Sequence, residues 1–170
     1  VRSRGLGDVY KRQPMLAATP LYSFTSETQS KIKRRIPSSG EMIPVVGMGS
    51  YQTFNVEKDK QLKSNLAQVL KTFFELGGKL IDSSPMYGHS EAVLGELMSI
   101  ITPTPQVFAA SKIWTYGQQA GMDSVSESQR RMQVAEMDLM QVHNLRDWKV
   151  HLQTLQKLKE NKKIRYTGIT

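Results

Sequence analysis

The chain of 170 residues has the size of one domain, but it is shorter than the about 250 residues of a complete eight-stranded α/β barrel. Hydrophobic residues make up 39% and charged residues 22%, a balance typical of a chain that folds around a core. The sequence contains no cysteine and no apolar run of membrane-spanning length. These counts exclude disulfides, thiolate metal sites, cysteine nucleophiles and a membrane-spanning helix in this sequence.

The net charge of +8 is concentrated at the beginning of the chain. Residues 1–35 hold eight Lys or Arg and two acidic residues, whereas residues 36–170 hold fifteen and thirteen. A nucleic-acid-binding face requires cations that cluster on a folded surface. We therefore expect neither a nucleic-acid partner nor a membrane partner.

The first thirty residues are predicted to lie outside the folded domain. Residues 1–13 show no helical or strand periodicity, which indicates an extension that is flexible or foreign to the fold. The mildly apolar stretch 15–24 leaves an exported form open beside the cytoplasmic location that we expect. The predicted division is therefore an extension at 1–30 and a folded part at 31–170.

Orderly patterning begins at Ile36. The polar residues 38–41 separate two short apolar runs, which predicts a β-hairpin that leads into a first strand at 45–49. Apolar residues then recur at helical spacing from Leu62 to Phe73. This spacing predicts an amphipathic helix that ends before Gly77.

The alternation of strands and helices continues to the end of the sequence. Strands are predicted at 79–82, 107–112, 138–142 and from 164, and helices at 91–101, at 122–132 and from 148 to the stretch 161–163. A strand recurs about every thirty residues, the size of one βα crossover unit. Such a pattern predicts a parallel α/β sheet, either doubly wound or closed into a barrel. Residues 47–52 lack the third glycine of the dinucleotide-binding fingerprint, so we favour a partial (β/α)8 barrel of about four and a half βα units.

Candidate catalytic residues lie at the ends of successive predicted strands. Asp82, Tyr87, Lys112 and His143 all fall where a strand ends, and barrels carry their reactive side chains at that edge. A free tyrosine ionises near pH 10 and needs a neighbouring cation to act as an acid at neutral pH. A lysine ammonium about 4 Å away would favour the phenolate by roughly 4 kcal/mol at an effective dielectric of 20. We expect Asp82 to keep that lysine charged and His143 to hold a carbonyl oxygen beside Tyr87.

Such a site can protonate an oxyanion, but none of its side chains can donate a hydride. A nicotinamide cofactor is therefore implied. A metal site is not expected, because the three histidines, His89, His143 and His151, lack metal-binding spacing.

Five segments resemble the aldo/keto reductase family. They are PVVGMGSYQTF, LIDSSPMYGHSEAVLGELM, VFAASKIW, DLMQVHN and KIRYTGIT, and the resemblance runs from about residue 36 to residue 170. It implies the reduction of an aldehyde or ketone by NADPH. In this reading Tyr87 is the general acid, Lys112 and Asp82 tune it, and His143 orients the substrate carbonyl.

The same resemblance implies the remaining contacts of the site. Those expected at the cofactor are Gly49, Ser50, Tyr51, Gln52, Asp82 and Asn144. Trp114 and His143 are expected to face a small carbonyl substrate.

The family barrel has eight βα units, whereas this sequence stops in the fifth strand. We therefore expect a part of a longer protein that is inactive alone, because later strands carry most of the cofactor pocket. Two alternatives stay open: a module that senses the cofactor or binds a partner, and a half-barrel that completes itself by dimerising.

Overall fold

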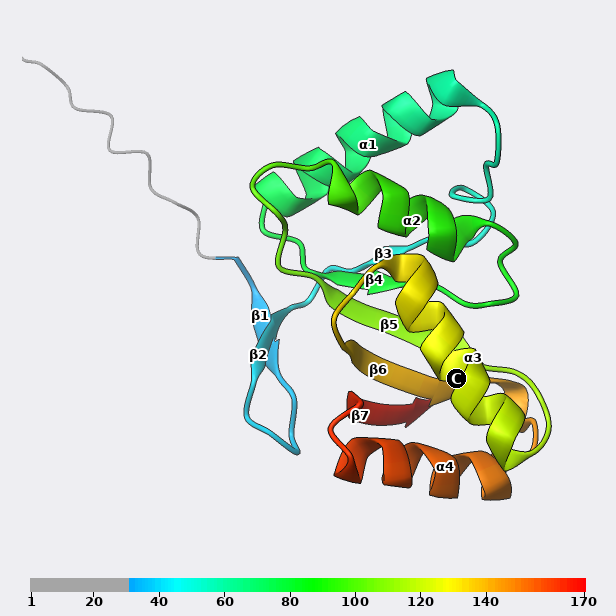
Figure 1. Cartoon of the computed structure of the whole chain (residues 1–170). Helices are drawn as coiled ribbons and strands as arrows, with labels where there is room; N and C mark the ends of the chain where they lie inside the picture. The colour runs from blue at the N-terminus through cyan, green and yellow to red at the C-terminus, as the bar shows by residue number, and fades with distance from the viewer. Residues whose placement is uncertain (1–30) are drawn as a thin grey trace, which may run out of the picture. The chain divides into compact units, whose positions relative to one another are not determined.

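The computed structural model describes residues 31–170. These residues form a two-stranded hairpin, followed by a five-stranded sheet with four helices (Figure 1). The extension predicted at 1–30, including the stretch 15–24, lies outside the described residues.

The order of the elements follows the predicted alternation. The strands are β1 (Lys33–Arg35), β2 (Met42–Pro44), β3 (Met48–Gly49), β4 (Leu80–Asp82), β5 (Phe108–Ile113), β6 (Met137–Val142) and β7 (Ile164–Ile169). The helices are α1 (Lys60–Glu75), α2 (Ser90–Ser99), α3 (Gln118–Met132) and α4 (Trp148–Glu160), and a 3-10 turn, η1 (His143–Leu145), follows β6.

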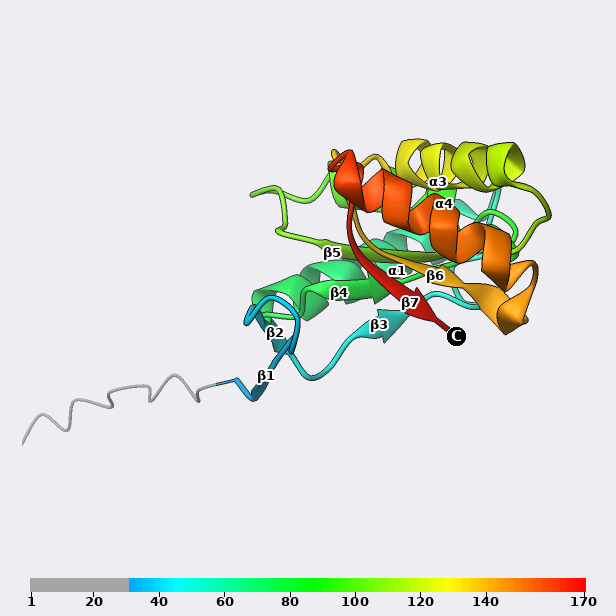
Figure 2. The same cartoon turned by 90° about the horizontal axis from the view of Figure 1, so that it is seen from below.

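The large sheet is parallel throughout and keeps its strands in chain order, β3-β4-β5-β6-β7. Each helix contacts the next one along the chain, and the helices lie on the same side of the curved sheet (Figure 2). A doubly wound fold would instead have helices on both faces. The one-sided arrangement is that of a barrel wall.

The two faces of the sheet differ in burial. On the helix-covered face, Ile81, Met140 and Val142 are completely buried and form the centre of the core. Strand residues alternate between faces, so Leu80 and Leu139 point the other way, where they are only half-buried. This second face corresponds to the interior of a barrel.

The hairpin is confirmed, but the first strand of the sheet is shorter than predicted. β1 and β2 pair antiparallel, and Gly40 closes their turn at a φ of +77°, where glycine is favoured. Residues 45 and 46 are exposed and lie outside the ladder, so β3 has only Met48 and Gly49. The first part of the apolar run 45–49 is therefore a connection, and only its last two residues form a strand.

Two helix boundaries also differ from the prediction. α3 begins at Gln118, four residues earlier than predicted, because its first turn is polar and small and carries no apolar periodicity. The glycine in that turn, Gly121, packs against the ring of the buried His151. α2 ends at Ser99, two residues before the predicted end.

Ionic contacts at the amino-terminal edge of the sheet join the hairpin to the strands. The guanidinium of Arg165 bonds to both Asp138 and Glu41, and the Tyr166 hydroxyl donates to Glu41 at 2.6 Å. Asp138 also accepts from the backbone N–H of Ala109 at 2.7 Å. Partial burial lowers the pKa of Arg165, but the hydrogen bond with Asp138 and the nearby negative charges outweigh it, so that this pKa is raised overall.

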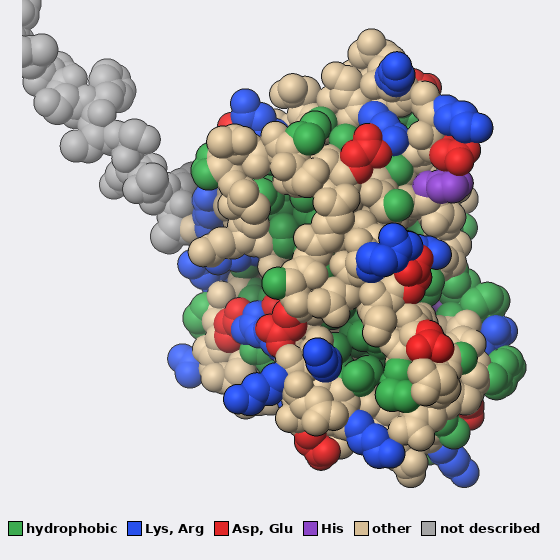
Figure 3. Space-filling view, viewed as in Figure 1, with side chains coloured by type: hydrophobic (Ala, Val, Ile, Leu, Met, Phe, Trp, Pro, Cys, Tyr) green, Lys and Arg blue, Asp and Glu red, His purple; other side chains and the backbone are tan. Residues whose placement is uncertain are grey.

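The surface seen in Figure 3 carries Lys and Arg side chains interspersed with Asp and Glu. Exposed apolar residues such as Val46, Leu76 and Ile100 come from different connections, after β2, α1 and α2. Within residues 31–170, no helix is both long enough and apolar enough to cross a bilayer.

Removal of the guanidinium at the amino-terminal edge should destabilise the fold. We expect Arg165→Leu to lower the free energy of unfolding by about 1–3 kcal/mol, because it leaves the largely buried Asp138 carboxylate without its cation. Urea denaturation measures this change. The matched control is Arg130→Leu, which removes an exposed cation and should leave the midpoint nearly unchanged. An equal change in unfolding free energy for the two substitutions would show that the Arg165 contacts do not stabilise the fold.

Candidate active site

A buried ion pair joins the carboxyl ends of two neighbouring strands. The ammonium of Lys112, on β5, lies 2.6 Å from Oδ2 of Asp82, on β4, and also donates to the backbone carbonyl of Ser83 at 2.7 Å. The lysine is only 3% exposed, so these acceptors replace its water. The register explains the contact, since Asp82 pairs with Ala110 and Lys112 follows two residues later on the same face.

Tyr87 lies beside this ion pair on the loop between β4 and α2. The Lys112 ammonium is 5.2 Å from the centroid of the Tyr87 ring. The loop is tight: Gly88 has a φ of +58°, and a Cβ there would lie 2.3 Å from Oδ1 of Asn55. The same Asn55 oxygen accepts from the backbone N–H of His89 at 2.9 Å, so this side chain closes the turn that presents Tyr87.

His143 is the first residue after β6, on the same edge of the sheet. Its side chain is half-buried, and its Nδ1 is buried with no hydrogen-bond partner in residues 31–170. The next residue, Asn144, has a left-handed backbone with a φ of +52°, and its N–H donates to the carbonyl of Thr170 at 2.8 Å. The structure thus brings the ends of β6 and β7 together, with the Asn144 side chain exposed.

The segment after β3 adds an open surface to this edge. Ser50 is buried and donates to the Ser83 hydroxyl at 2.8 Å, which fixes the loop against the end of β4. Tyr51 is 62% exposed, and the centroid of its ring lies 4.9 Å from the centroid of the Tyr87 ring. A Cβ at Gly49 would meet nothing within 4 Å, so there is open space above this strand. Gln52 is also exposed, with a φ of +58°.

Trp114 follows β5 by one residue and is half-buried. The guanidinium of Arg146 lies 3.6 Å from the centroid of its ring. The four predicted residues of the acid site and Trp114 are thus all found at one edge of the sheet. The predicted cofactor contacts after β3 lie at that edge as well.

Sequence reasoning missed three contributors to this edge. Gln141 donates to the second oxygen of Asp82 at 3.1 Å, Ser83 provides a backbone acceptor for Lys112, and Arg146 covers the indole of Trp114. Gln141 could have been identified, because it is a polar residue near the carboxyl end of a predicted strand, where barrels carry their reactive side chains. The contact of Arg146 depends on the path of the loop and had no signal in the sequence.

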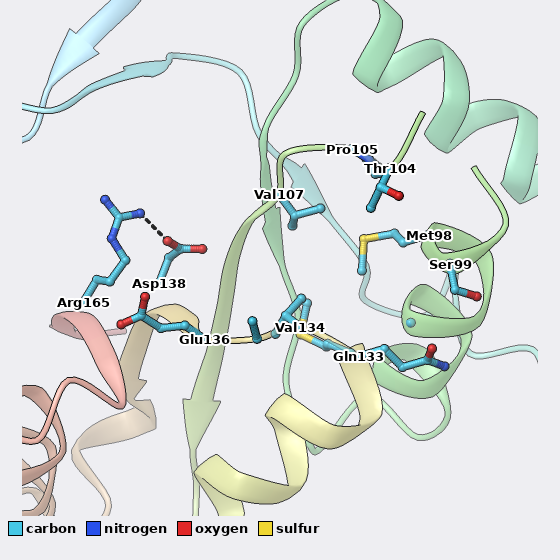
Figure 4. A pocket seen from close by; sticks show the side chains of 13 residues that line it. Met98, Ser99, Thr104, Pro105, Val107, Gln133, Val134, Glu136, Asp138 and Arg165 are labelled. Atoms are coloured by element: carbon cyan, nitrogen blue, oxygen red, sulfur yellow. Dashed lines mark hydrogen bonds and ion pairs between the residues drawn. The ribbon is translucent and has the colours of Figure 1, made fainter. Parts of the chain in front are cut away.

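A cavity lies at the opposite, amino-terminal edge of the sheet (Figure 4). It has a volume of about 490 Å³, with Met98, Val107 and Val134 among its apolar lining residues. Its cation, Arg165, is already paired with Asp138. This cavity contains none of the acid-site residues, and barrels carry their chemistry at the carboxyl edge, so the candidate site is the edge with Lys112.

Comparison with known proteins identifies relatives of one kind. The family model described as "Aldo/keto reductase family" matches residues 45–170. Methylglyoxal reductase YeaE of Escherichia coli (strain K12) is 33% identical over 116 residues, which cover 65% of this chain and 39% of that protein. L-galactose dehydrogenase of Arabidopsis thaliana is 29% identical over 154 residues, 81% of this chain and 47% of that protein. The chain thus spans less than half the length of these two relatives.

Solved structures show the same fold. An aldo-keto reductase from Bacillus halodurans, in its holo form, has a TM-score of 0.69 at 20% identity, over 82% of this chain and 50% of that one. An aldo/keto reductase from Klebsiella pneumoniae, in complex with NADP and acetate, has a TM-score of 0.67 at 20% identity, over 81% and 50%. These structures are (β/α)8 barrels of which the chain covers a part, so the predicted fold class is confirmed.

The ion pair predicts an asymmetric response to mutation. Asp82→Asn should lower the free energy of unfolding by about 2–4 kcal/mol, because it leaves the buried Lys112 ammonium without a counter-charge. Lys112→Met should cost about half as much, since the Asp82 carboxylate is one-third exposed and keeps its bond from Gln141.

Urea denaturation of the two variants measures the difference. The matched control is Asp123→Asn on the exposed face of α3, which should change the midpoint little. A larger loss of unfolding free energy in Lys112→Met than in Asp82→Asn would contradict this prediction.

Proposed function

Because the chain belongs to the aldo/keto reductase family, we propose that the complete protein reduces an aldehyde or ketone to an alcohol with NADPH. The observation that carries the proposal is the meeting of Tyr87 with the buried Lys112–Asp82 pair at the carboxyl edge. The proposal refers to the complete protein, since the chain spans 39% of the methylglyoxal reductase it matches.

The side chains support an acid role for Tyr87. The carbonyl oxygen becomes an alkoxide when a hydride adds to its carbon, and the Tyr87 hydroxyl then gives its proton to that oxygen. The Lys112 ammonium stabilises the resulting phenolate by charge, and Asp82 with the carbonyl of Ser83 holds the ammonium in position. His143 donates from its ring to the carbonyl oxygen and orients it beside Tyr87.

The residues after β3 fit a flat cofactor ring. The open space at Gly49 lies beside Asp82, its partner in β4, and the exposed ring of Tyr51 lies beside Tyr87, where a hydride donor would have to lie. The reduced nicotinamide supplies the hydride that no side chain provides. Gly49, Ser50, Tyr51, Asp82 and Asn144 would contact it from this half of the site. The choice of NADPH is supported by the Klebsiella pneumoniae relative, which was solved with NADP.

The substrate is proposed to be a small carbonyl compound. The name of the relative YeaE, a methylglyoxal reductase, supports this class. Trp114 would form one wall of the substrate pocket, because its half-buried ring stands two residues beyond Lys112. An indole wall is apolar and rigid, and it confines a small ligand without competing for its hydrogen bonds.

Loss of the Tyr87 hydroxyl should abolish most of the turnover. In the complete enzyme, we expect Tyr87→Phe to lower kcat for aldehyde reduction by at least about 10²-fold, because the alkoxide loses its proton donor. NADPH oxidation with a panel of aldehydes measures the rate. The control is Tyr166→Phe, which removes a phenol hydroxyl at the opposite edge and should retain the rate.

Two outcomes would contradict the proposal. Near-normal turnover of Tyr87→Phe would remove this residue from the acid role. Tight NADPH binding without oxidation by any aldehyde would favour a module that senses the cofactor.

A further inference from the structure

Three side chains that follow β6 hold the segment after β5 in place. The carboxylate of Asp147 accepts from the backbone N–H of Gly117 at 2.8 Å. A ring nitrogen of the buried His151 lies 2.9 Å from the carbonyl oxygen of Thr115. Arg146 lies over the Trp114 ring at 3.6 Å and 5.1 Å from the centroid of Tyr116. The guanidinium is thus fixed by aromatic faces on a segment that is itself held in place.

The hydrogen-bonding capacity of Arg146 is not used. Its guanidinium forms no ion pair and no hydrogen bond with any residue in 31–170, and it is half-buried. Stacking occupies the face of a guanidinium, whereas its five N–H donors lie in the plane. The stacked Arg146 therefore presents an in-plane fork of donors that matches a carboxylate or phosphate.

The position of this fork is at the candidate active site. Arg146 follows His143 by three residues, and its backbone N–H donates to the His143 carbonyl at 3.1 Å. The ring it covers, Trp114, is two residues beyond Lys112. The carboxylate nearest in sequence, Asp147, is turned to Gly117 and is not paired with the guanidinium.

We propose that Arg146 binds an anionic group of the substrate, so that the preferred substrates are carbonyl compounds that carry a carboxylate or a phosphate. This inference rests on the proposed reductase function. Arg146 would bind the end of the substrate remote from the carbonyl, while Trp114 keeps the guanidinium from rotating. Such an anchor orients the carbonyl toward Tyr87 and His143 without taking part in proton transfer.

The test compares substrates of nearly the same shape in the complete enzyme. They are 4-carboxybenzaldehyde, 4-formylphenyl phosphate and the neutral 4-nitrobenzaldehyde, whose nitro group has the shape of a carboxylate. We expect Arg146→Gln to lower the ratio of kcat/KM for an anionic over the neutral aldehyde by about 10- to 100-fold, mainly through KM. Arg146→Lys keeps the charge without the fork and should lower the ratio less. The matched control Arg34→Gln removes an exposed cation on the hairpin and should leave it unchanged.

The two anionic substrates identify the group that the Arg146 guanidinium binds. A larger fall for the carboxylate assigns a keto or aldehyde acid, and a larger fall for the phosphate assigns a phosphorylated carbonyl compound. A ratio that Arg146→Gln leaves unchanged in both arms overturns the anchor, even if all three aldehydes are reduced.

A binding measurement separates this inference from the proposed function. Residues 1–170 contain two tryptophans, so Trp148→Phe removes the second indole of this part of the protein, and comparison with Arg146→Gln isolates the signal of Trp114. Benzoate that pairs with Arg146 should change the emission of Trp114 saturably, whereas neutral benzamide should not, and Arg146→Gln should abolish the response. An enzyme that reduces no aldehyde but shows this response loses the reductase proposal and keeps the anion site. Equal responses to benzoate and benzamide overturn the anion site.

Discussion

The structure of the candidate site depends on a lysine ammonium that is buried away from water. Lys112 is buried, so its charge is tolerable only where Asp82 and the Ser83 carbonyl meet it within hydrogen-bond distance. That requirement restricts the register of β4 against β5, because a shift by one residue would turn Lys112 to the helix-covered face. The ion pair therefore specifies the alignment of the sheet as well as the surroundings of Tyr87.

The two faces of the sheet also differ in the side chains that they carry. Mostly apolar residues fill the helix-covered face, where the buried Ser111 bonds to Glu91, whereas the charged pair Lys112–Asp82 lies near the carboxyl end of the other face. The amino-terminal edge has its own ionic contacts, centred on Arg165, and these join the hairpin rather than serve the acid site. The division agrees with barrels in general, in which one edge stabilises the fold and the other carries the chemistry.

Periodicity predicted the order of the elements because each helix and strand buries an apolar face against its neighbours. It was less accurate at element ends. The polar first turn of α3 has no apolar signal, and the run before β3 is apolar without being a strand. The residues of the acid site could be predicted because they lie at or soon after the carboxyl ends of strands. The contact of Arg146 instead depends on left-handed residues at 144, 145 and 147. A sequence pattern does not encode where such a loop turns, and the catalytic and cofactor roles of the site residues stay predictions.

The hairpin also has a consequence for the order of assembly during synthesis. Glu41 meets its partner Arg165 across 124 positions of sequence. At about 5–20 residues per second, a ribosome needs roughly 6–25 s to add the intervening chain. Over that interval Glu41 cannot form its contact with Arg165. Attachment of the hairpin to β7 must therefore wait until Arg165 has been synthesised, after β3 to β6.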